Sequence, residues 1–205
     1  MSDLKLYYCP QTRCRTALWM LEEVGADYTI IPVNVRDEIE SDAFADISPM
    51  RKVPALQVGD ELVTETAAIC LYLADAFPAA GLTPAIGEAG RASLTRWMFF
   101  GSAVMEPAAF DKATGRDAPA GSIGWGNWDR VIATLKTGLE GREYLVNDRF
   151  SAADVALGAT MGFLMNFNMM EKDPLFVSYV ERLTARPAFQ QANTIDAERA
   201  AALAS

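Results

Sequence analysis

The sequence predicts an α/β domain followed by an all-helical domain, and three features of the chain support this prediction. Short β-rich runs alternate with helical periodicity over roughly the first 77 residues. A stretch rich in Pro, Gly and Ala follows at 78–87 and is typical of a linker between domains. Beyond it only helical patterns recur. We therefore expect a first domain at 1–78, a linker at 79–87 and an all-helical domain at 88–205.

Within the first domain, the predicted order is βαβ, then a polar loop with a short helix, then ββα. The last two strands flank Gly59-Asp60, and two β-runs joined by a two-residue turn of this kind predict a hairpin. Gly25 stands where the first helix is expected to stop. The strands are expected at 4–8, 28–35, 53–58 and 61–63, the loop at 36–48, and the helices at 13–24 and 66–77.

The second domain is predicted to contain five helical segments. Glu106-Pro107 predicts a kink in the first, because proline removes a backbone donor. The third has a well-specified start: Ser151 is the N-cap and Asp154 stands three residues later, a capping box with Asp in place of Glu. Asp154 is therefore predicted to be structural. The segments are expected at 88–114, 127–140, 151–166, 174–185 and 188–203.

Composition and charge exclude several classes of function. Of 205 residues, 51% are hydrophobic and 22% are charged, as in a folded globular protein. The net charge of -9 makes nucleic acid a poor partner, since phosphate backbones need clustered Lys and Arg. No apolar run reaches the ~18 residues that cross a membrane, and the start lacks the features of a signal peptide. We expect a cytoplasmic protein with no membrane or nucleic-acid partner.

Histidine is absent from the sequence and cysteine is rare. Without histidine, Ser-His-Asp catalysis, Cys-His catalysis and imidazole metal sites are excluded, and no metal is expected. The three cysteines, Cys9, Cys14 and Cys70, argue by their odd number against a disulfide framework and fit a reducing compartment. Cys14 and Cys70 fall within helical patterns and are predicted to belong to the core.

The segment from Met50 to Leu56 carries the strongest functional signal. Pro54 opens a strand inside an apolar run, where it cannot donate a hydrogen bond to a ladder. If the Val53–Pro54 bond is cis, the N–H and C=O of Val53 turn outward together and can pair with an extended peptide. From local sequence alone, a trans proline that begins an edge strand is the commoner alternative.

Glu65 and Thr66 stand at a predicted helix start, shortly after the hairpin. Backbone N–H groups and the helix dipole at such a start favour a ligand carboxylate, and the Thr66 hydroxyl adds a donor. Glu65 could accept a hydrogen bond from an ammonium group. The alternative is that one of these residues only caps the helix.

Together these segments resemble the glutathione S-transferase family. The resemblance rests on Val53-Pro54-Ala55-Leu56, Thr64-Glu65-Thr66-Ala67-Ala68-Ile69 and Leu71-Tyr72-Leu73, and extends to 5–10, 18–25, 96–100 and 150–157. It therefore spans nearly the whole chain. It implies a thioredoxin-like βαβαββα domain followed by an all-helical domain, in agreement with the predicted element order.

The resemblance implies a role for each residue of a glutathione site. Val53 would pair with the cysteinyl part of glutathione beside cis-Pro54. Glu65 and Thr66 would hold the γ-glutamyl end of the tripeptide. Lys52 would lie near its glycyl carboxylate, and Arg51 would assist Lys52 in binding that carboxylate.

The residue that activates the glutathione thiol stays open among three candidates, Tyr8, Cys9 and Thr12. A hydroxyl group would lower the thiol pKa by donating a hydrogen bond to the thiolate, whereas a cysteine would form a mixed disulfide with glutathione. Many bacterial members carry serine at the places of Cys9 and Thr12. Cys9-Pro10 resembles the start found in omega-type members.

The implied function is a glutathione transferase with a detoxification role, which directs the thiol of its co-substrate at a small electrophile. The electrophile would bind between the domains, with Trp97 and Phe100 as candidate lining residues. One alternative is a Cys-dependent glutathione thiol transferase or reductase, and another is a non-catalytic glutathione-binding module with the same fold. The resemblance also implies a homodimer.

Overall fold

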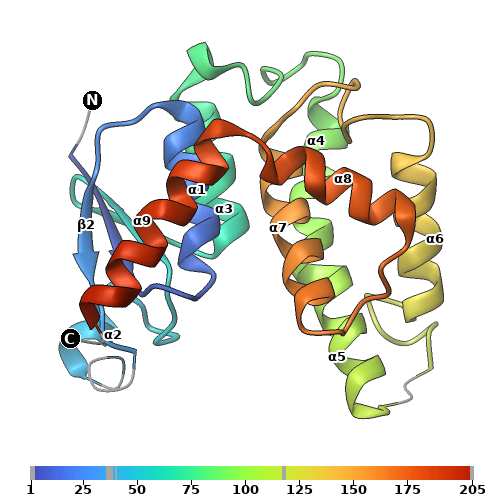
Figure 1. The fold of residues 1–205 in the computed structure, drawn as a ribbon, viewed down its shortest axis with the longest axis horizontal. Helices are drawn as coiled ribbons and strands as arrows, with labels where there is room; N and C mark the ends of the chain where they lie inside the picture. Colours follow the sequence, from blue (N-terminus) through green and yellow to red (C-terminus); the bar gives the residue numbers. More distant parts are fainter. Residues whose placement is uncertain (1–2, 36–38, 40, 117–118, 204–205) are drawn as a thin grey trace. The chain divides into compact units, whose positions relative to one another are not determined.

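The computed structural model describes residues 3–35, 39, 41–116 and 119–203 (Figure 1). The chain divides into two compact units, one of Met1–Ala80 with Arg186–Ser205 and one of Gly81–Ala185. The division at Ala80–Gly81 falls within the predicted linker. The last helix differs from the prediction, because it belongs to the first unit and not to the all-helical segment expected at 88–205.

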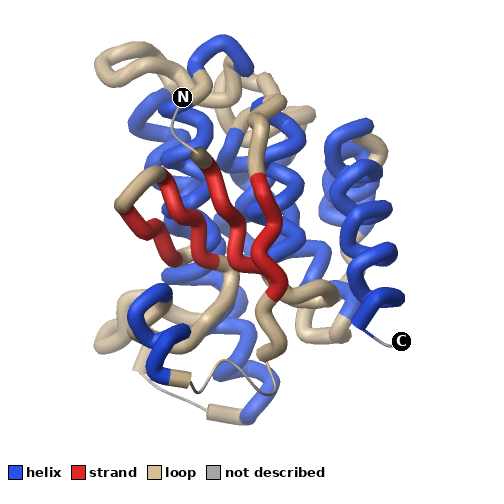
Figure 2. The backbone as a smooth tube through the Cα atoms, turned by 90° about the vertical axis from the view of Figure 1, so that its left-hand side faces the viewer, coloured by secondary structure: helices blue, strands red, loops and turns tan. Residues whose placement is uncertain are grey.

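The first unit has the βαβαββα order of a thioredoxin-like domain, which confirms the predicted fold class. Its four strands lie side by side in one sheet (Figure 2). The order is β2-β1-β3-β4, in which β1 pairs in parallel with β2 and antiparallel with β3. The elements are β1 (Leu4–Tyr8), α1 (Cys14–Val24), β2 (Thr29–Pro32), α2 (Asp42–Ile47), β3 (Ala55–Val58), β4 (Glu61–Thr64) and α3 (Thr66–Ala76).

The local sequence explains the main elements of this unit. Alternate residues of β1 are buried, as expected for a strand with one face on the core. Helix α1 ends at Gly25, whose φ of 64° is the left-handed conformation that glycine adopts without a steric penalty. The predicted hairpin is confirmed, since Val58 pairs with Glu61 across the turn. Residues 36–38 and 40 of the predicted loop lie outside the described residues, and α2 is the short helix expected in the remainder.

Helix α9 (Pro187–Leu203) joins the first unit because it packs against α1. The rings of Trp19 and Phe189 meet edge to face with centroids 5.0 Å apart. Glu23 accepts hydrogen bonds from the Trp19 indole at 2.8 Å and from two guanidinium nitrogens of Arg186 at 2.7 and 2.8 Å. The Glu23 side chain is 5% exposed, so this ion pair is shielded from water.

The second unit consists of helices. They are α4 (Arg91–Phe100), α5 (Glu106–Thr114), α6 (Trp128–Leu139), α7 (Ala152–Asn166) and α8 (Pro174–Thr184). A π-helical turn at Gly101–Met105 joins α4 to α5, directly before the Glu106-Pro107 pair at which the sequence predicts a kink. A wider turn before Pro107 fits the chemistry of proline, whose ring clashes with the carbonyl group four residues earlier in a regular helix.

Asp154 forms the polar centre of the second unit and confirms the predicted capping box at the start of α7. Its carboxylate is fully buried and accepts hydrogen bonds from the Ser151 N–H at 2.9 Å and the Ser151 hydroxyl at 2.8 Å. It also accepts from the Leu145 N–H at 3.0 Å and the Tyr179 hydroxyl at 2.8 Å. One carboxylate therefore connects the start of α7 to α8 and to the loop before α7.

Among the described residues, the helices are too short or too polar to traverse a lipid bilayer.

Candidate functional site

Strand pairing brings the three segments singled out from the sequence to one edge of the sheet. Tyr7 lies opposite Ala55, and Ala55 lies opposite Thr64. The chain that leaves β1, the chain that enters β3 and the chain that leaves β4 are therefore neighbours. Cys9, Pro54 and Thr66, which are far apart in the sequence, are consequently placed at the same edge.

The segment after β1 contains Cys9 and Thr12. Cys9 is 7% exposed, and its sulfur lies 3.7 Å from the Pro10 carbonyl oxygen. The Thr12 hydroxyl donates to the Cys9 carbonyl at 2.7 Å and accepts from the Cys14 N–H at 3.2 Å. Thr12 therefore closes a tight turn at the start of α1, where backbone N–H groups favour negative charge.

Tyr8, the third candidate for activating the glutathione thiol, is buried inside the first unit. Its ring is 1% exposed, and its hydroxyl donates a hydrogen bond to Asp196 of α9. Burial, followed by the contact with this carboxylate, raises the pKa of Tyr8 well above its usual value. The same carboxylate accepts from the Gln11 N–H, at 3.0 and 3.3 Å from its two oxygens.

Cys14 and Cys70 are fully buried, which confirms that both belong to the core. Burial raises the pKa of Cys14 to about 11 and that of Cys70 to about 12. The sulfur of Cys14 lies beneath the turn after β1, where it accepts a hydrogen bond from the Cys9 N–H at 3.3 Å. Both thiols are therefore protonated at neutral pH and screened from solvent.

We expect Cys14 and Cys70 to resist alkylation in the folded protein. A thiol with a pKa near 11 is ionised in roughly one molecule in a thousand at pH 8, and the thiolate is the reactive form. Brief treatment with iodoacetamide at pH 8, followed by peptide mass spectrometry, should find modification at Cys9 first. Unfolding in urea should expose all three thiols. Rapid labelling of Cys70 in the folded state would contradict the burial described here.

The Val53–Pro54 peptide bond is cis, so the trans alternative is not adopted. The Lys52 side chain before it is exposed. Arg51 points its guanidinium group at the chain before α2, with contacts of 3.2 Å to the Ser41 carbonyl and 3.5 Å to the Asp42 carboxylate. Lys52 therefore offers a cation at the surface, whereas the charge of Arg51 is directed at this loop.

Glu65 and Thr66 mark the start of α3, as the sequence predicts. Glu65 is exposed and has φ 67° and ψ 115°, a conformation that residues other than glycine seldom adopt. Its side chain makes no capping hydrogen bond to the first turn of α3. The first N–H groups of α3 and the positive end of its dipole are thus open to an anionic ligand.

Trp97 and Phe100 lie in the second unit, where they are 3% and 9% exposed. Their rings meet at 5.2 Å, and the Arg96 guanidinium lies 4.3 Å above the Trp97 ring. A Cβ atom at Gly138 would come within 2.5 Å of the Trp97 ring, so α4 and α6 are closely packed there. Both rings contribute to the packing of this unit, and their contact with an electrophile stays a prediction.

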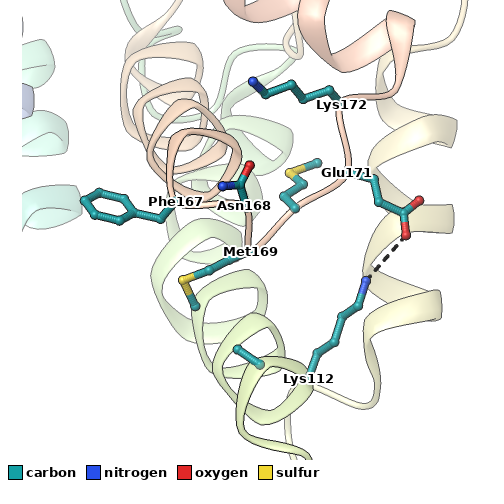
Figure 3. A pocket seen from close by; sticks show the side chains of 8 residues that line it. Lys112, Phe167, Asn168, Met169, Glu171 and Lys172 are labelled. Atoms are coloured by element: carbon teal, nitrogen blue, oxygen red, sulfur yellow. Dashed lines mark ion pairs between the residues drawn. The ribbon is translucent and has the colours of Figure 1, made fainter.

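A hollow of about 570 Å³ opens in the second unit, between the end of α5 and the chain after α7 (Figure 3). Lys112 and Glu171 form an ion pair of 3.6 Å across it, and the Phe167 ring is 65% exposed. Its lining also includes Ala113, Asn168, Met169, Met170 and Lys172. Among the described residues, no group of three or more His, Cys, Asp or Glu side chains is arranged to hold a metal ion.

Asp196 lies beside the turn after β1 and was not identified from the sequence. It follows Ile195 in a helix that sequence reasoning assigned to the other domain. Its partners Tyr8 and Gln11 lie more than 180 positions upstream, at separations of 188 and 185 residues. Local patterns extend over a few helical turns, so no local signal could have identified this contact.

The first unit thus combines a thioredoxin-like sheet with a cysteine turn, a cis-proline strand entry and a Glu-Thr helix start at one edge, the class of fold and site that the resemblance to glutathione S-transferases predicts. The family model for the glutathione S-transferase N-terminal domain matches residues 2–75. The chain belongs to the glutathione S-transferase family, because a family member of known structure is 30% identical to it over nearly the full length of both chains.

Three relatives show how far this similarity extends. The crystal structure of a glutathione transferase from Methylococcus capsulatus is 30% identical, with a TM-score of 0.77 over 95% of this chain and 98% of that one. A sphingomonad glutathione S-transferase, solved in complex with glutathione, is 29% identical, with a TM-score of 0.77 over 94% and 98%. Glutathione S-transferase GstA of Escherichia coli O157:H7 is 25% identical over 92% of this chain and 96% of its own length.

Proposed function

We propose that this protein is a glutathione transferase that binds glutathione at the sheet edge of its first unit and activates the thiol for attack on a small electrophile. The observation that carries the proposal is the alignment of Tyr7, Ala55 and Thr64 across three strands. This alignment gives one ligand access to the backbone of Val53, the start of α3 and the turn after β1. Membership of the family supports the same chemistry.

The charges at this edge complement those of glutathione, a tripeptide with two carboxylates and one ammonium group. The start of α3 suits the γ-glutamyl carboxylate, and the exposed Glu65 suits the adjacent ammonium group. Lys52 suits the glycyl carboxylate. Local positive potential of this kind is needed because the net charge of the chain is -9.

The proposed reaction begins with transfer of the proton from the glutathione thiol to solvent water. The thiolate then forms a carbon–sulfur bond to the electrophile, and the electron pair of the broken bond leaves with the displaced group. We place the thiolate at the start of α1, where the Thr12 hydroxyl and the N–H groups of the first turn favour negative charge. For this, the Thr12 hydroxyl would turn its proton from the Cys9 carbonyl to the ligand sulfur.

Cys9 supports a second candidate function, a thiol transferase. Its sulfur lies 3.7 Å from the Pro10 carbonyl oxygen and its residue is 7% exposed, whereas Cys14 and Cys70 are fully buried. In this reaction the Cys9 thiolate attacks the glutathionyl sulfur of a mixed disulfide and releases the other thiolate. A second glutathione then attacks the Cys9–glutathione disulfide, which yields glutathione disulfide and restores the thiolate.

We expect Thr66→Ala to weaken glutathione binding by about tenfold, because one hydroxyl donor to a charged ligand group is lost. Isothermal titration calorimetry with glutathione measures the effect directly, without any electrophile. The matched control is Thr194→Ala on α9, whose hydroxyl bonds the Gln190 carbonyl in an exposed position. Wild-type protein that binds no glutathione at millimolar concentration would refute the proposed function.

We also propose a cytoplasmic homodimer. Two large aromatic rings in the helical unit support an apolar interface: Phe99 on α4 is 54% exposed and Phe110 on α5 is 53% exposed.

A further inference from the structure

Asp196 connects the last helix of the chain to the turn that carries the candidate thiol-activating groups. Its side chain is buried and accepts hydrogen bonds from the Tyr8 hydroxyl and the Gln11 N–H. These two donors lie on either side of Cys9 and Pro10. A single carboxylate therefore holds both ends of the segment 8–11, which leads into the proposed site, by hydrogen bonds.

Gln11 adopts a backbone conformation that needs such support. Its φ is 59°, in the left-handed region that residues other than glycine enter at a cost, while its side chain is exposed. Conformations of this kind persist where surrounding structure holds them. The Asp196 carboxylate holds this one through the Gln11 N–H, and the next residue along the chain is Thr12.

We propose that Asp196 is a positioning residue that holds the left-handed turn at Gln11 and thereby sets the places of Cys9 and Thr12 for glutathione chemistry. The inference rests on the proposed function and adds a residue of α9 to it. Because catalysis depends on placement within a fraction of an ångström, a buried carboxylate acting through the backbone can control the rate without touching the substrate.

The remaining contacts of α9 make this role testable apart from folding. Glu23 and Arg186 anchor the start of α9 through two hydrogen bonds, and Trp19 packs on Phe189. The partners of the Glu23 carboxylate, Trp19 and Arg186, lie outside the turn at 9–12. The helix thus has an attachment that does not depend on Asp196.

The first measurement compares three variants with the wild type. Asp196→Ala is expected to lower kcat for glutathione conjugation about a hundredfold and to speed both amide exchange at Gln11 and alkylation of Cys9. Gln11→Gly alone is expected to remain close to wild type, because glycine adopts the left-handed conformation freely. Combined with Asp196→Ala, it should recover about tenfold in kcat. This rescue separates positioning from a general loss of packing.

Glu23→Gln is the matched control, since it weakens the other attachment of α9. It should lower the unfolding temperature while the Gln11 amide exchange, the Cys9 alkylation rate and kcat stay at wild-type values. Amide exchange and alkylation need no glutathione, so they report on the turn even if the proposed function fails. Equal exchange and alkylation in Asp196→Ala and wild type would overturn the inference, as would the absence of rescue by Gln11→Gly.

Discussion

Replacing Asp154 with alanine is expected to lower the free energy of unfolding by about 4 kcal/mol. The carboxylate is fully buried and accepts four hydrogen bonds, from the Ser151 N–H, the Ser151 hydroxyl, the Leu145 N–H and the Tyr179 hydroxyl. Its removal leaves these donors in an interior that water does not reach. A domain of this size is typically stable by about 5–15 kcal/mol, so the loss is a large fraction of the total free energy of unfolding.

Asp154→Asn tests whether the unit is stabilised by the ability of this carboxylate to accept hydrogen bonds through both of its oxygens. Asparagine has the same shape, but its amide nitrogen would face a donor where a carboxylate oxygen now accepts. We expect most of the alanine effect to appear with this substitution as well. Urea denaturation followed by circular dichroism measures the change, with limited proteolysis of the segment 81–185 as an independent readout.

Asn127→Ala provides the control for an ordinary helix cap. Asn127 caps α6 in the same unit, accepting from the Arg130 N–H at 3.0 Å, but it is exposed to solvent. Its removal should cost about 1 kcal/mol, because water can replace the lost partner. A similar small effect for Asp154→Ala would show that the buried network does not stabilise the unit.

The largest effects on activity are expected at Thr12 and Cys9. Thr12→Val keeps the shape of the side chain and removes the hydroxyl, so glutathione conjugation should fall by about a hundredfold if this group stabilises the thiolate. Thr12→Ser, which keeps a hydroxyl, should retain most of the rate. The pKa of the bound thiol should rise in Thr12→Val, because the thiolate loses a donor, and the pH–rate profile should move to higher pH.

Cys9→Ser separates the two candidate functions. It should abolish glutathione-dependent reduction of a mixed disulfide, because serine cannot form the covalent intermediate. Conjugation of a test electrophile should continue at close to the wild-type rate. Loss of conjugation in Cys9→Ser with full activity in Thr12→Val would reverse the proposed assignment. Glutathione binding without turnover in either assay would favour the non-catalytic alternative.

Much of the fold was accessible from the sequence because its signals are local. The Gly59-Asp60 turn predicted the hairpin, and Gly25 predicted the end of α1. The spacing of Ser151 and Asp154 predicted the capping box. Each depends on interactions within a few residues, so a single sequence carries the information. The π-helical turn before Pro107 was missed because its position depends on how neighbouring helices pack.

The sequence by itself determined the element order, the residue types at the candidate glutathione site and the absence of histidine chemistry. Only the tertiary structure showed that α9 packs on α1, that the Tyr8 hydroxyl donates a hydrogen bond to Asp196, and that Arg51 faces the chain before α2. The physical reason is how far apart in the sequence the interacting residues lie. Helix periods, turns and caps act between near neighbours, whereas burial and side-chain pairing join residues that only the folded chain brings together.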